Sequence, residues 1–140
     1  MVYADTSALI KLYLEEPHSA AVIGLSESAA MVVCRVTWAE AMAAFARRAR
    51  ERPQDADLVE NAKLSFARTW ARLAIVEVSQ SLVERAGDYA DTFALRAYDA
   101  VQLAAAQELA MPLRVPLVFA CFDSRLNKAA RALGMQVPFA

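Results

Sequence analysis

Residues 2–10 read Val-Tyr-Ala-Asp-Thr-Ser-Ala-Leu-Ile. Residues 2–4 favour a short strand, and the Asp5-Thr6-Ser7 cluster that follows them offers side chains that cap a helix. The segment 8–15 is amphipathic, with apolar residues at helical spacing. The sequence therefore begins with a strand that passes directly into a helix.

The same order of strand and helix continues along the chain. Further strands are expected at residues 30–34, 74–78 and 117–122, with an optional edge strand at residues 135–139. Helices are expected at residues 8–15, 17–28, 38–51, 55 or 57 to 73, 79–96, 99–109 and 124–134. Strands that are continuous apolar runs are typical of a parallel sheet covered by helices on both faces. We therefore expect a three-layer α/β domain with a central, mainly parallel sheet of four to five strands flanked by helices.

The length and composition fit one domain over residues 1–140. A chain of 140 residues with 58% hydrophobic residues can bury a sizeable core, and no linker or internal repeat divides it. Residues 38–73 predict a helical hairpin. The basic run at residues 47–53 marks its exposed turn.

The charge balance argues against a protein that binds nucleic acid through an overall basic field. The chain contains fifteen Lys and Arg residues and sixteen Asp and Glu residues, which gives a net charge of −1. No apolar run approaches the roughly 18 residues that a membrane span needs, and no basic segment precedes an apolar one at the N-terminus. We expect a cytoplasmic protein with no membrane contact, in which Cys34 and Cys121 are buried thiols.

Four acidic residues lie at or near the starts of predicted helices. Asp5 follows the first strand, Asp123 follows the fourth, and Glu40 lies in the first turn of the helix after the second strand. Asp99 begins a helix whose same face is otherwise apolar. Ligands of open parallel sheets bind beyond the carboxyl ends of the strands, so these acids are the first candidates for a functional site.

Each acid also has a purely structural interpretation. The two acids that directly follow strands suit helix N-caps. Glu40 is placed to complete a capping box with Thr37, and Asp99 is placed to pair with Arg96 three residues before it. Only the joint placement of the four acids at one edge of the sheet favours a functional site.

Carboxylates that converge at one edge need compensation. Two charges about 4 Å apart cost on the order of 4 kcal/mol at an effective dielectric constant of about 20. Such a site takes up a proton or a cation, and oxygen ligands without a histidine favour Mg²⁺ or Mn²⁺ over zinc. His18 lies beside Pro17 in an expected surface turn and is not a predicted ligand. The chemistry indicated is metal-assisted hydrolysis of a phosphodiester by water.

Three further side chains are candidates to support that chemistry. Ser7 lies two residues after Asp5, where it would ligate the ion or its water, or else cap the helix. Lys11 and Arg96 are the nearest basic candidates for the scissile phosphate, or else solvated surface charges.

The four acids stand in the segments DTSALIKLY (5–13), TWAE (37–40), LRAYDAVQLA (95–104) and FDSRL (122–126). In their order and spacing these segments resemble the motifs of the PIN domain nucleases, and among them the VapC-type toxins of bacterial toxin–antitoxin pairs. The resemblance covers nearly the whole chain. Each motif alone is weak, but four of them in order are specific.

The resemblance implies a Mg²⁺- or Mn²⁺-dependent endoribonuclease that hydrolyses RNA with a metal-activated water. Asp5, Glu40, Asp99 and Asp123 would be its catalytic residues: Asp5 and Asp99 would hold the metal, Asp123 would support it directly or through water, and Glu40 would orient the water. The resemblance also implies a homodimer and a cognate antitoxin that blocks the site, with the helical hairpin forming part of the antitoxin groove.

Two residues depart from the family pattern. The family often has Ser at the position of Cys34, and Thr or Ser at the position of Cys121. A thiol is a poor ligand for Mg²⁺, so the support around Asp123 is expected to differ from the usual family arrangement. The four carboxylates themselves are intact.

Three other functions stay open at this point. One is a PIN-fold module that binds RNA or an antitoxin without turnover, and another is an RNA-processing nuclease outside a toxin pair. A phosphatase with Asp5 as nucleophile ranks lower, because such enzymes commonly carry a second Asp where this chain has Ser7. The sequence does not indicate which RNA would be cut.

Overall fold

Four short parallel strands form the centre of the computed structural model, which describes residues 1–139. They are β1 (Val2–Ala4), β2 (Met31–Cys34), β3 (Ala74–Val76) and β4 (Val118–Ala120). Their order is β3-β2-β1-β4, and every pairing is parallel. The chain moves from β1 outward to β3 and then returns to the other side of β1. The winding therefore reverses between β1 and β4, the position at which parallel sheets bind ligands.

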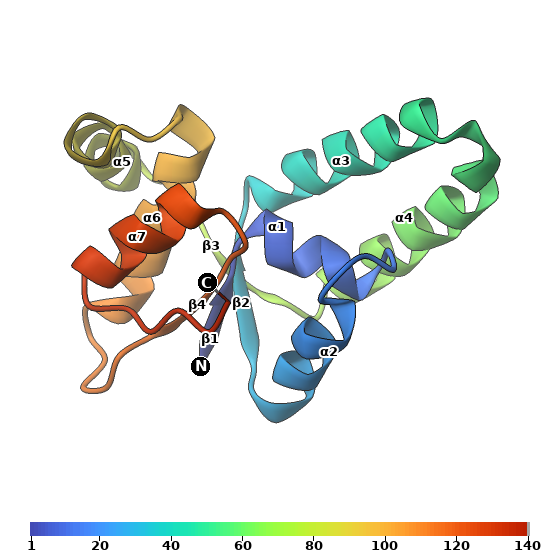
Figure 1. Ribbon diagram of the computed structural model, residues 1–140. Coiled ribbons are helices and arrows are strands. Elements are labelled where there is room, and N and C mark those ends of the chain that lie inside the picture. The colour runs from blue at the N-terminus through green and yellow to red at the C-terminus, as the bar shows by residue number, and fades with distance from the viewer. Residues whose placement is uncertain (140) are drawn as a thin grey trace.

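Helices cover both faces of this sheet (Figure 1). One face carries α1 (Thr6–Leu9), the 3-10 helix η1 (Ile10–Leu12), α2 (Ser19–Ser28), α3 (Thr37–Glu51), the 3-10 helix η2 (Pro53–Asp55) and α4 (Ala56–Trp70). The other carries α5 (Gln80–Phe93), α6 (Ala97–Ala110) and α7 (Ser124–Ala132). The three-layer α/β architecture expected from the sequence is confirmed.

The sheet separates two apolar cores because successive strand side chains point to opposite faces. Val2 packs in the core beneath the first group of helices with Phe45. Tyr3, the next residue, packs in the opposite core with Leu103 and Phe119. Burial on both faces explains why the strands are apolar without alternation.

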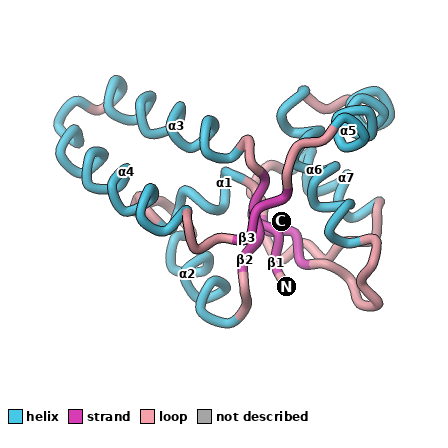
Figure 2. The backbone as a smooth tube through the Cα atoms, turned by 180° about the vertical axis from the view of Figure 1, so that it is seen from behind, coloured by secondary structure: helices cyan, strands magenta, loops and turns pink. Residues whose placement is uncertain are grey.

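Helices α3 and α4 form an antiparallel pair that extends away from the sheet, as Figure 2 shows from behind. Phe66 of α4 is fully buried and lies 5.7 Å from the Phe45 ring and 5.2 Å from the Trp38 ring, measured between centroids. Near the turn, Arg48 Nε donates to Asp55 Oδ2 at 3.0 Å. Aromatic packing along the pair and an ion pair at its end hold the two helices together.

Several element boundaries differ from those predicted. Residues 135–139 form no strand, and only an isolated parallel bridge joins Gln136 to Val118. The first helix gives way to η1 and stops at Leu12. The second helix starts at Ser19 instead of Pro17, because His18 adopts a left-handed backbone with φ 74°. Among residues 1–139, no helix is both long and apolar enough to cross a membrane.

Candidate active site

Asp5 directly follows β1 and is the N-cap of α1. It is only 5% exposed, and its Oδ2 accepts hydrogen bonds from the Ser7 backbone N–H at 3.1 Å and from Ser7 Oγ at 2.7 Å. Burial raises the pKa of Asp5 above its ordinary value, and the bonds from Ser7 partly oppose that rise. Asp5 is therefore both a cap and a buried carboxylate whose ionised form is costly.

Glu40 lies in the first turn of α3, half-buried beside α1. Its Oε1 accepts from Thr6 Oγ1 at 2.8 Å and from Gln102 Nε2 at 2.6 Å. Burial raises the pKa of Glu40, these two bonds lower it, and the charges of Asp5 and Asp99 raise it further. Glu40 therefore does not form the expected capping box with Thr37. Its side chain instead accepts hydrogen bonds from Thr6 of α1 and from Gln102, which lies in α6.

Asp99 and Asp123 complete the group. Asp99 lies in the first turn of α6, and its pKa is raised first by burial, then by the charges of Asp5 and Asp123, while Arg96 lowers it. Asp123 is exposed and is the N-cap of α7, where its Oδ1 accepts from the Leu126 N–H at 2.8 Å. Asp123 is thus the helix N-cap that the sequence predicts, and its charge also acts on Asp99.

The charges of Asp5 and Asp99 act on Glu40, and those of Asp5 and Asp123 act on Asp99, at the carboxyl edge of the sheet. No three metal-ligating side chains within residues 1–139 form a complete ion site. Mg²⁺ does not need one, because it commonly binds one or two carboxylates and keeps several waters. The hard carboxylate oxygens of this group fit a divalent cation of that type.

Gln102 is a residue of this site that the sequence analysis missed. It is completely buried, and its Nε2 contacts Glu40, Thr37 Oγ1 at 2.9 Å and Thr6 Oγ1 at 3.2 Å. Its Oε1 accepts from the Tyr3 hydroxyl at 2.5 Å. The sequence did contain a signal for this residue, because Gln102 is a polar residue within an alanine-rich helix. A buried amide needs hydrogen-bond partners, so its position indicates a polar contact in the core.

The three predicted supporting residues differ in what they contact. Ser7 Oγ bridges the site, because it donates to Asp5 and accepts from the Phe122 N–H at 3.1 Å. Lys11 Nζ pairs with Glu16 at 3.2 Å and lies 4.8 Å from the Phe122 ring centroid. Arg96 is exposed just before α6, where its charge acts on Asp99.

Cys121 lies beside Asp5, at the position where the resemblance implies a hydroxyl. Its Sγ lies 3.5 Å from Asp5 Oδ2 and accepts from the Asp123 N–H at 3.3 Å. Burial and the neighbouring Asp5 charge raise the pKa of this thiol strongly, so it stays neutral. Cys34 is buried as well, and both thiols are free, as predicted.

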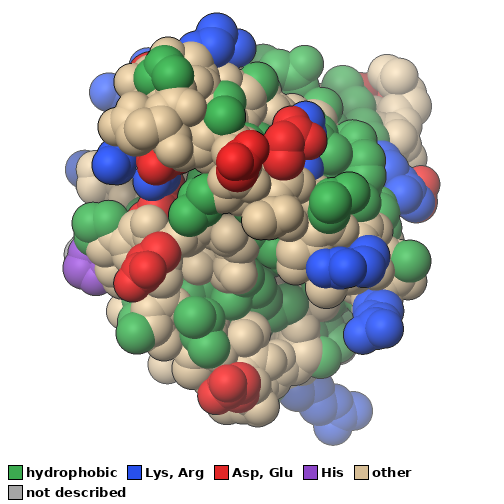
Figure 3. Space-filling view, turned by 90° about the vertical axis from the view of Figure 1, so that its right-hand side faces the viewer, with side chains coloured by type: hydrophobic (Ala, Val, Ile, Leu, Met, Phe, Trp, Pro, Cys, Tyr) green, Lys and Arg blue, Asp and Glu red, His purple; other side chains and the backbone are tan. Residues whose placement is uncertain are grey.

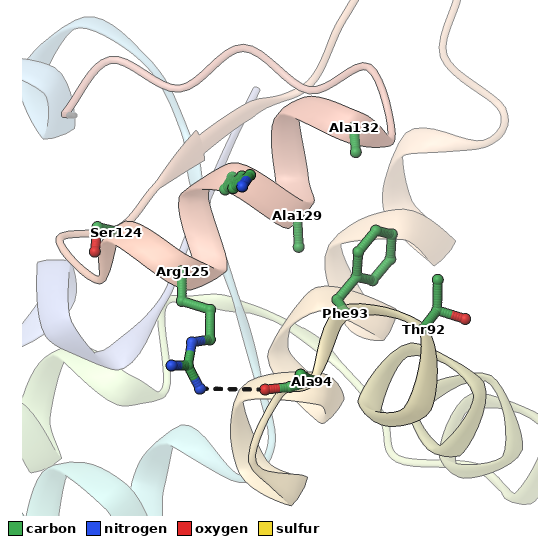
Figure 4. Close-up of a pocket in the computed structure, with 8 residues that line it drawn as sticks. Thr92, Phe93, Ala94, Ser124, Arg125, Ala129 and Ala132 are labelled. Carbon is green, nitrogen blue, oxygen red and sulfur yellow. Dashed lines mark hydrogen bonds between the residues drawn. The ribbon is translucent and has the colours of Figure 1, made fainter.

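A separate pocket of about 750 Å³ lies between the end of α5 and α7 (Figure 4). Phe93 and Ala129 line it, and Arg125 Nη1 donates to the Ala94 carbonyl at 3.3 Å across one side. None of the four acids lines it, so this pocket is distinct from the acidic edge.

Comparison with known proteins agrees with these features. A family profile described as PIN domain matches residues 2–132. Ribonuclease VapC49 of Mycobacterium tuberculosis is 33% identical over 138 residues, which cover 98% of this chain and 94% of the relative. Ribonuclease VapC46 of the same organism is 32% identical over 137 residues, covering 97% and 95%.

Two solved structures have the same fold. A toxin-antitoxin complex from Klebsiella pneumoniae matches with a TM-score of 0.64 at 19% identity, over 89% of this chain and 88% of that one. The structure of FitAcB from Neisseria gonorrhoeae matches with a TM-score of 0.61 at 18% identity, over 100% and 97%. At these identities the likeness concerns the fold alone.

Proposed function

The chain belongs to the PIN domain family, with VapC ribonucleases among its relatives, and from this premise we propose that it is a cytoplasmic endoribonuclease and the toxin of a toxin–antitoxin pair. The observation that carries the proposal is the placement of Asp5, Glu40, Asp99 and Asp123 at the starts of α1, α3, α6 and α7, beside the switch point of the sheet. Burial raises the pKa values of Asp5, Glu40 and Asp99, a perturbation that is common at catalytic sites.

Asp5 and Asp99 would hold one divalent cation, Mg²⁺ or Mn²⁺, with Asp123 supporting it directly or through water. When bound, the ion supplies Lewis-acid chemistry: it lowers the pKa of water and offsets the charge of the phosphate. The neutral Cys121 thiol beside Asp5 is a poor ligand for such an ion, so it would pack against the site without coordinating.

Glu40 would orient the attacking water and accept its proton. Thr6 and Gln102 hold its Oε1, and no hydrogen bond to Oε2 is found within residues 1–139. The second oxygen is thus available to a water in the site. The upward shift of the Glu40 pKa is in the direction that suits a general base, since proton transfer is more efficient as the pKa of the base comes closer to the working pH.

The surface offers no broad basic field to draw in RNA. On the side from which α3 and α4 extend, acidic, basic and hydrophobic side chains are intermixed (Figure 3). The net charge of the chain is −1. RNA would therefore approach the acids through the bound cation, and its affinity in the absence of divalent ions should be modest.

The proposal includes two protein partners. Exposed apolar side chains on α5 and α6, Val83 and Tyr98, are candidates to be covered in a homodimer. A cognate antitoxin would lie along α3 and α4, where Leu58 and Leu64 are exposed, and an antitoxin arginine would neutralise the carboxylates in place of metal.

Expression of the chain without any antitoxin, followed by sequencing of newly formed RNA 5′ ends, tests the toxin proposal. The parent should arrest bacterial growth and produce new ends at defined sites. Asp5→Asn, expressed to the same level, should do neither. Growth and RNA ends that are identical for the two proteins would overturn the proposal.

A further inference from the structure

Three aromatic rings stack beside the acidic site. The centroids of the His18 and Phe122 rings are 5.4 Å apart with planes 23° from parallel, and those of Phe122 and Phe139 are 4.7 Å apart with planes 10° from parallel. The rings come from three distant segments: the loop before α2, the loop after β4 and the end of the chain. We call this group the aromatic stack.

The aromatic stack is joined directly to the candidate active site. Phe122 immediately precedes Asp123 in the sequence. Its backbone N–H donates to Ser7 Oγ at 3.1 Å, and Ser7 Oγ donates to Asp5 Oδ2 at 2.7 Å. The backbone of Phe122 is thus linked to the Asp5 carboxylate through a single side chain, that of Ser7.

Phe122 is the fixed centre of the stack. It is half-buried, its ring stacks with those of both His18 and Phe139, and Lys11 Nζ lies 4.8 Å from its ring centroid. Glu16 holds that ammonium at 3.2 Å. The supporting ring is thus positioned by contacts that do not depend on a ligand.

His18 is the exposed member of the stack. Its backbone is left-handed, with φ 74°, a conformation that residues other than glycine rarely adopt. Its side chain makes no capping hydrogen bond to α2. Histidine is among the residue types enriched in this conformation. Helix capping does not explain the orientation of its side chain, whereas the stacking on Phe122 does.

We propose that His18, supported by Phe122 and Phe139, is the platform on which one base of a single-stranded RNA stacks beside the acidic site. The inference rests on the ribonuclease function proposed above and adds a base-binding subsite to it. Proteins that bind single-stranded RNA stack unpaired bases on His and Phe rings. Because the chain has no net positive charge, such a non-ionic contact contributes affinity that phosphate contacts alone do not provide.

Binding of short fluorescent single-stranded RNAs, read by anisotropy, tests the proposal. All measurements use the Glu40→Gln background with Mg²⁺, which removes the proposed proton acceptor but keeps the proposed metal ligands Asp5 and Asp99, so that cleavage does not consume the probe. His18→Gly removes the ring and accepts the left-handed backbone, so the variant should fold, which circular dichroism checks. His18→Phe keeps a stacking ring. Ile23→Ala, at an exposed site on the neighbouring helix α2, is the matched control.

His18→Gly should weaken binding of oligoadenylate by about five- to a hundredfold, the range expected for loss of one stacked base. His18→Phe and Ile23→Ala should bind like the starting protein. Oligoadenylate should bind more tightly than oligouridylate, because purines stack better, and this preference should shrink in His18→Gly.

Two results would overturn the platform. Unchanged oligoadenylate affinity in His18→Gly would show that the ring does not contact a base, and equal losses in His18→Gly and His18→Phe would assign the effect to the polarity of the imidazole. Failure of the ribonuclease proposal gives a different pattern. In that case the protein without the Glu40 substitution leaves RNA intact with Mg²⁺, while the adenylate preference and its loss are still measured.

Discussion

Asp5 shows how one residue links stability to the proposed activity. Its pKa is raised by burial, so the folded protein holds the neutral carboxyl more readily than the unfolded chain does. Stability from this group is complete below the ordinary pKa of 3.8 and is lost as the pH rises through the raised value. At neutral pH the ionised Asp5 therefore destabilises the fold.

Asp5→Asn should consequently raise the melting temperature at pH 7 when divalent ions are removed with EDTA. The amide oxygen can still accept from Ser7, so the cap is kept. The difference between variant and parent should narrow as the pH is lowered through the raised pKa of Asp5, because the parent carboxyl then takes up a proton. Calorimetry across this pH range measures both melting temperatures. A variant that melts below the parent at pH 7 would contradict the prediction that ionised Asp5 destabilises the fold.

Gln102 positions Glu40 without touching substrate. Gln102→Met should lower the free energy of unfolding by about 1–3 kcal/mol, because Tyr3 and Glu40 lose buried hydrogen-bond partners. It should lower kcat more than it raises KM. The acid limb of the pH–rate profile should move to higher pH, since the Gln102 bond lowers the pKa of Glu40.

Gln107→Met, on the same helix, is the matched control for this prediction. The Oε1 of Gln107 has no hydrogen-bond partner within residues 1–139, so its loss should change neither stability nor the pH profile to a comparable degree. If both substitutions shift the profile equally, Gln102 has no specific positioning role.

At the scale of elements, Asp123, the N-cap of α7, has two roles that can be tested separately. Asp123 caps the helix through Oδ1 and contributes charge to the acidic group. Asp123→Ala should cost about 0.5–2 kcal/mol of stability, whereas Asp123→Asn keeps the cap and should cost much less. Both variants should lose cleavage activity if the charge supports the cation. Chemical denaturation and a cleavage assay together separate the roles, and full activity in Asp123→Asn would refute the second one.

The elements and the acids were predictable from the sequence for a physical reason. Asp5, Glu40, Asp99 and Asp123 each follow a strand or open a helix, and parallel strands bring those positions to one edge. The contact between Gln102 and Tyr3 was not predictable, since 99 residues separate the partners and an alanine-rich helix resembles plain core.

The predicted boundaries of helices and strands were wrong where tertiary contacts or backbone conformation override the local sequence pattern. Residues 135–139 are apolar enough for a strand, yet only Gln136 makes a bridge to β4. The left-handed His18 delays the start of α2, although Pro17 suits a first helical position. Histidine is one of the residue types enriched in this conformation, but most histidines do not adopt it, so the sequence did not predict it.

At the scale of the whole molecule, the two cores share one sheet. Adjacent β1 residues serve opposite cores, since Val2 packs in one and Tyr3 in the other. We therefore propose that residues 1–140 unfold as one cooperative domain. Tryptophan fluorescence reports on α3 and α4 through Trp38 and Trp70, while far-ultraviolet circular dichroism reports on all helices. The two urea transitions should coincide. A fluorescence transition at clearly lower urea would show that the α3–α4 pair unfolds independently.

The central claim is that the four carboxylates form one site that hydrolyses RNA with a bound divalent cation. The most direct measurement is the rate of RNA cleavage by purified parent, Asp99→Asn and Asp91→Asn, each with Mg²⁺ or Mn²⁺ and with EDTA. Asp91 is an exposed acid on α5 and serves as the matched control. Asp99→Asn should be slower than the parent by about a hundredfold or more, Asp91→Asn should match it, and EDTA should abolish cleavage. Parental rates in Asp99→Asn, or cleavage that persists in EDTA, would contradict the account.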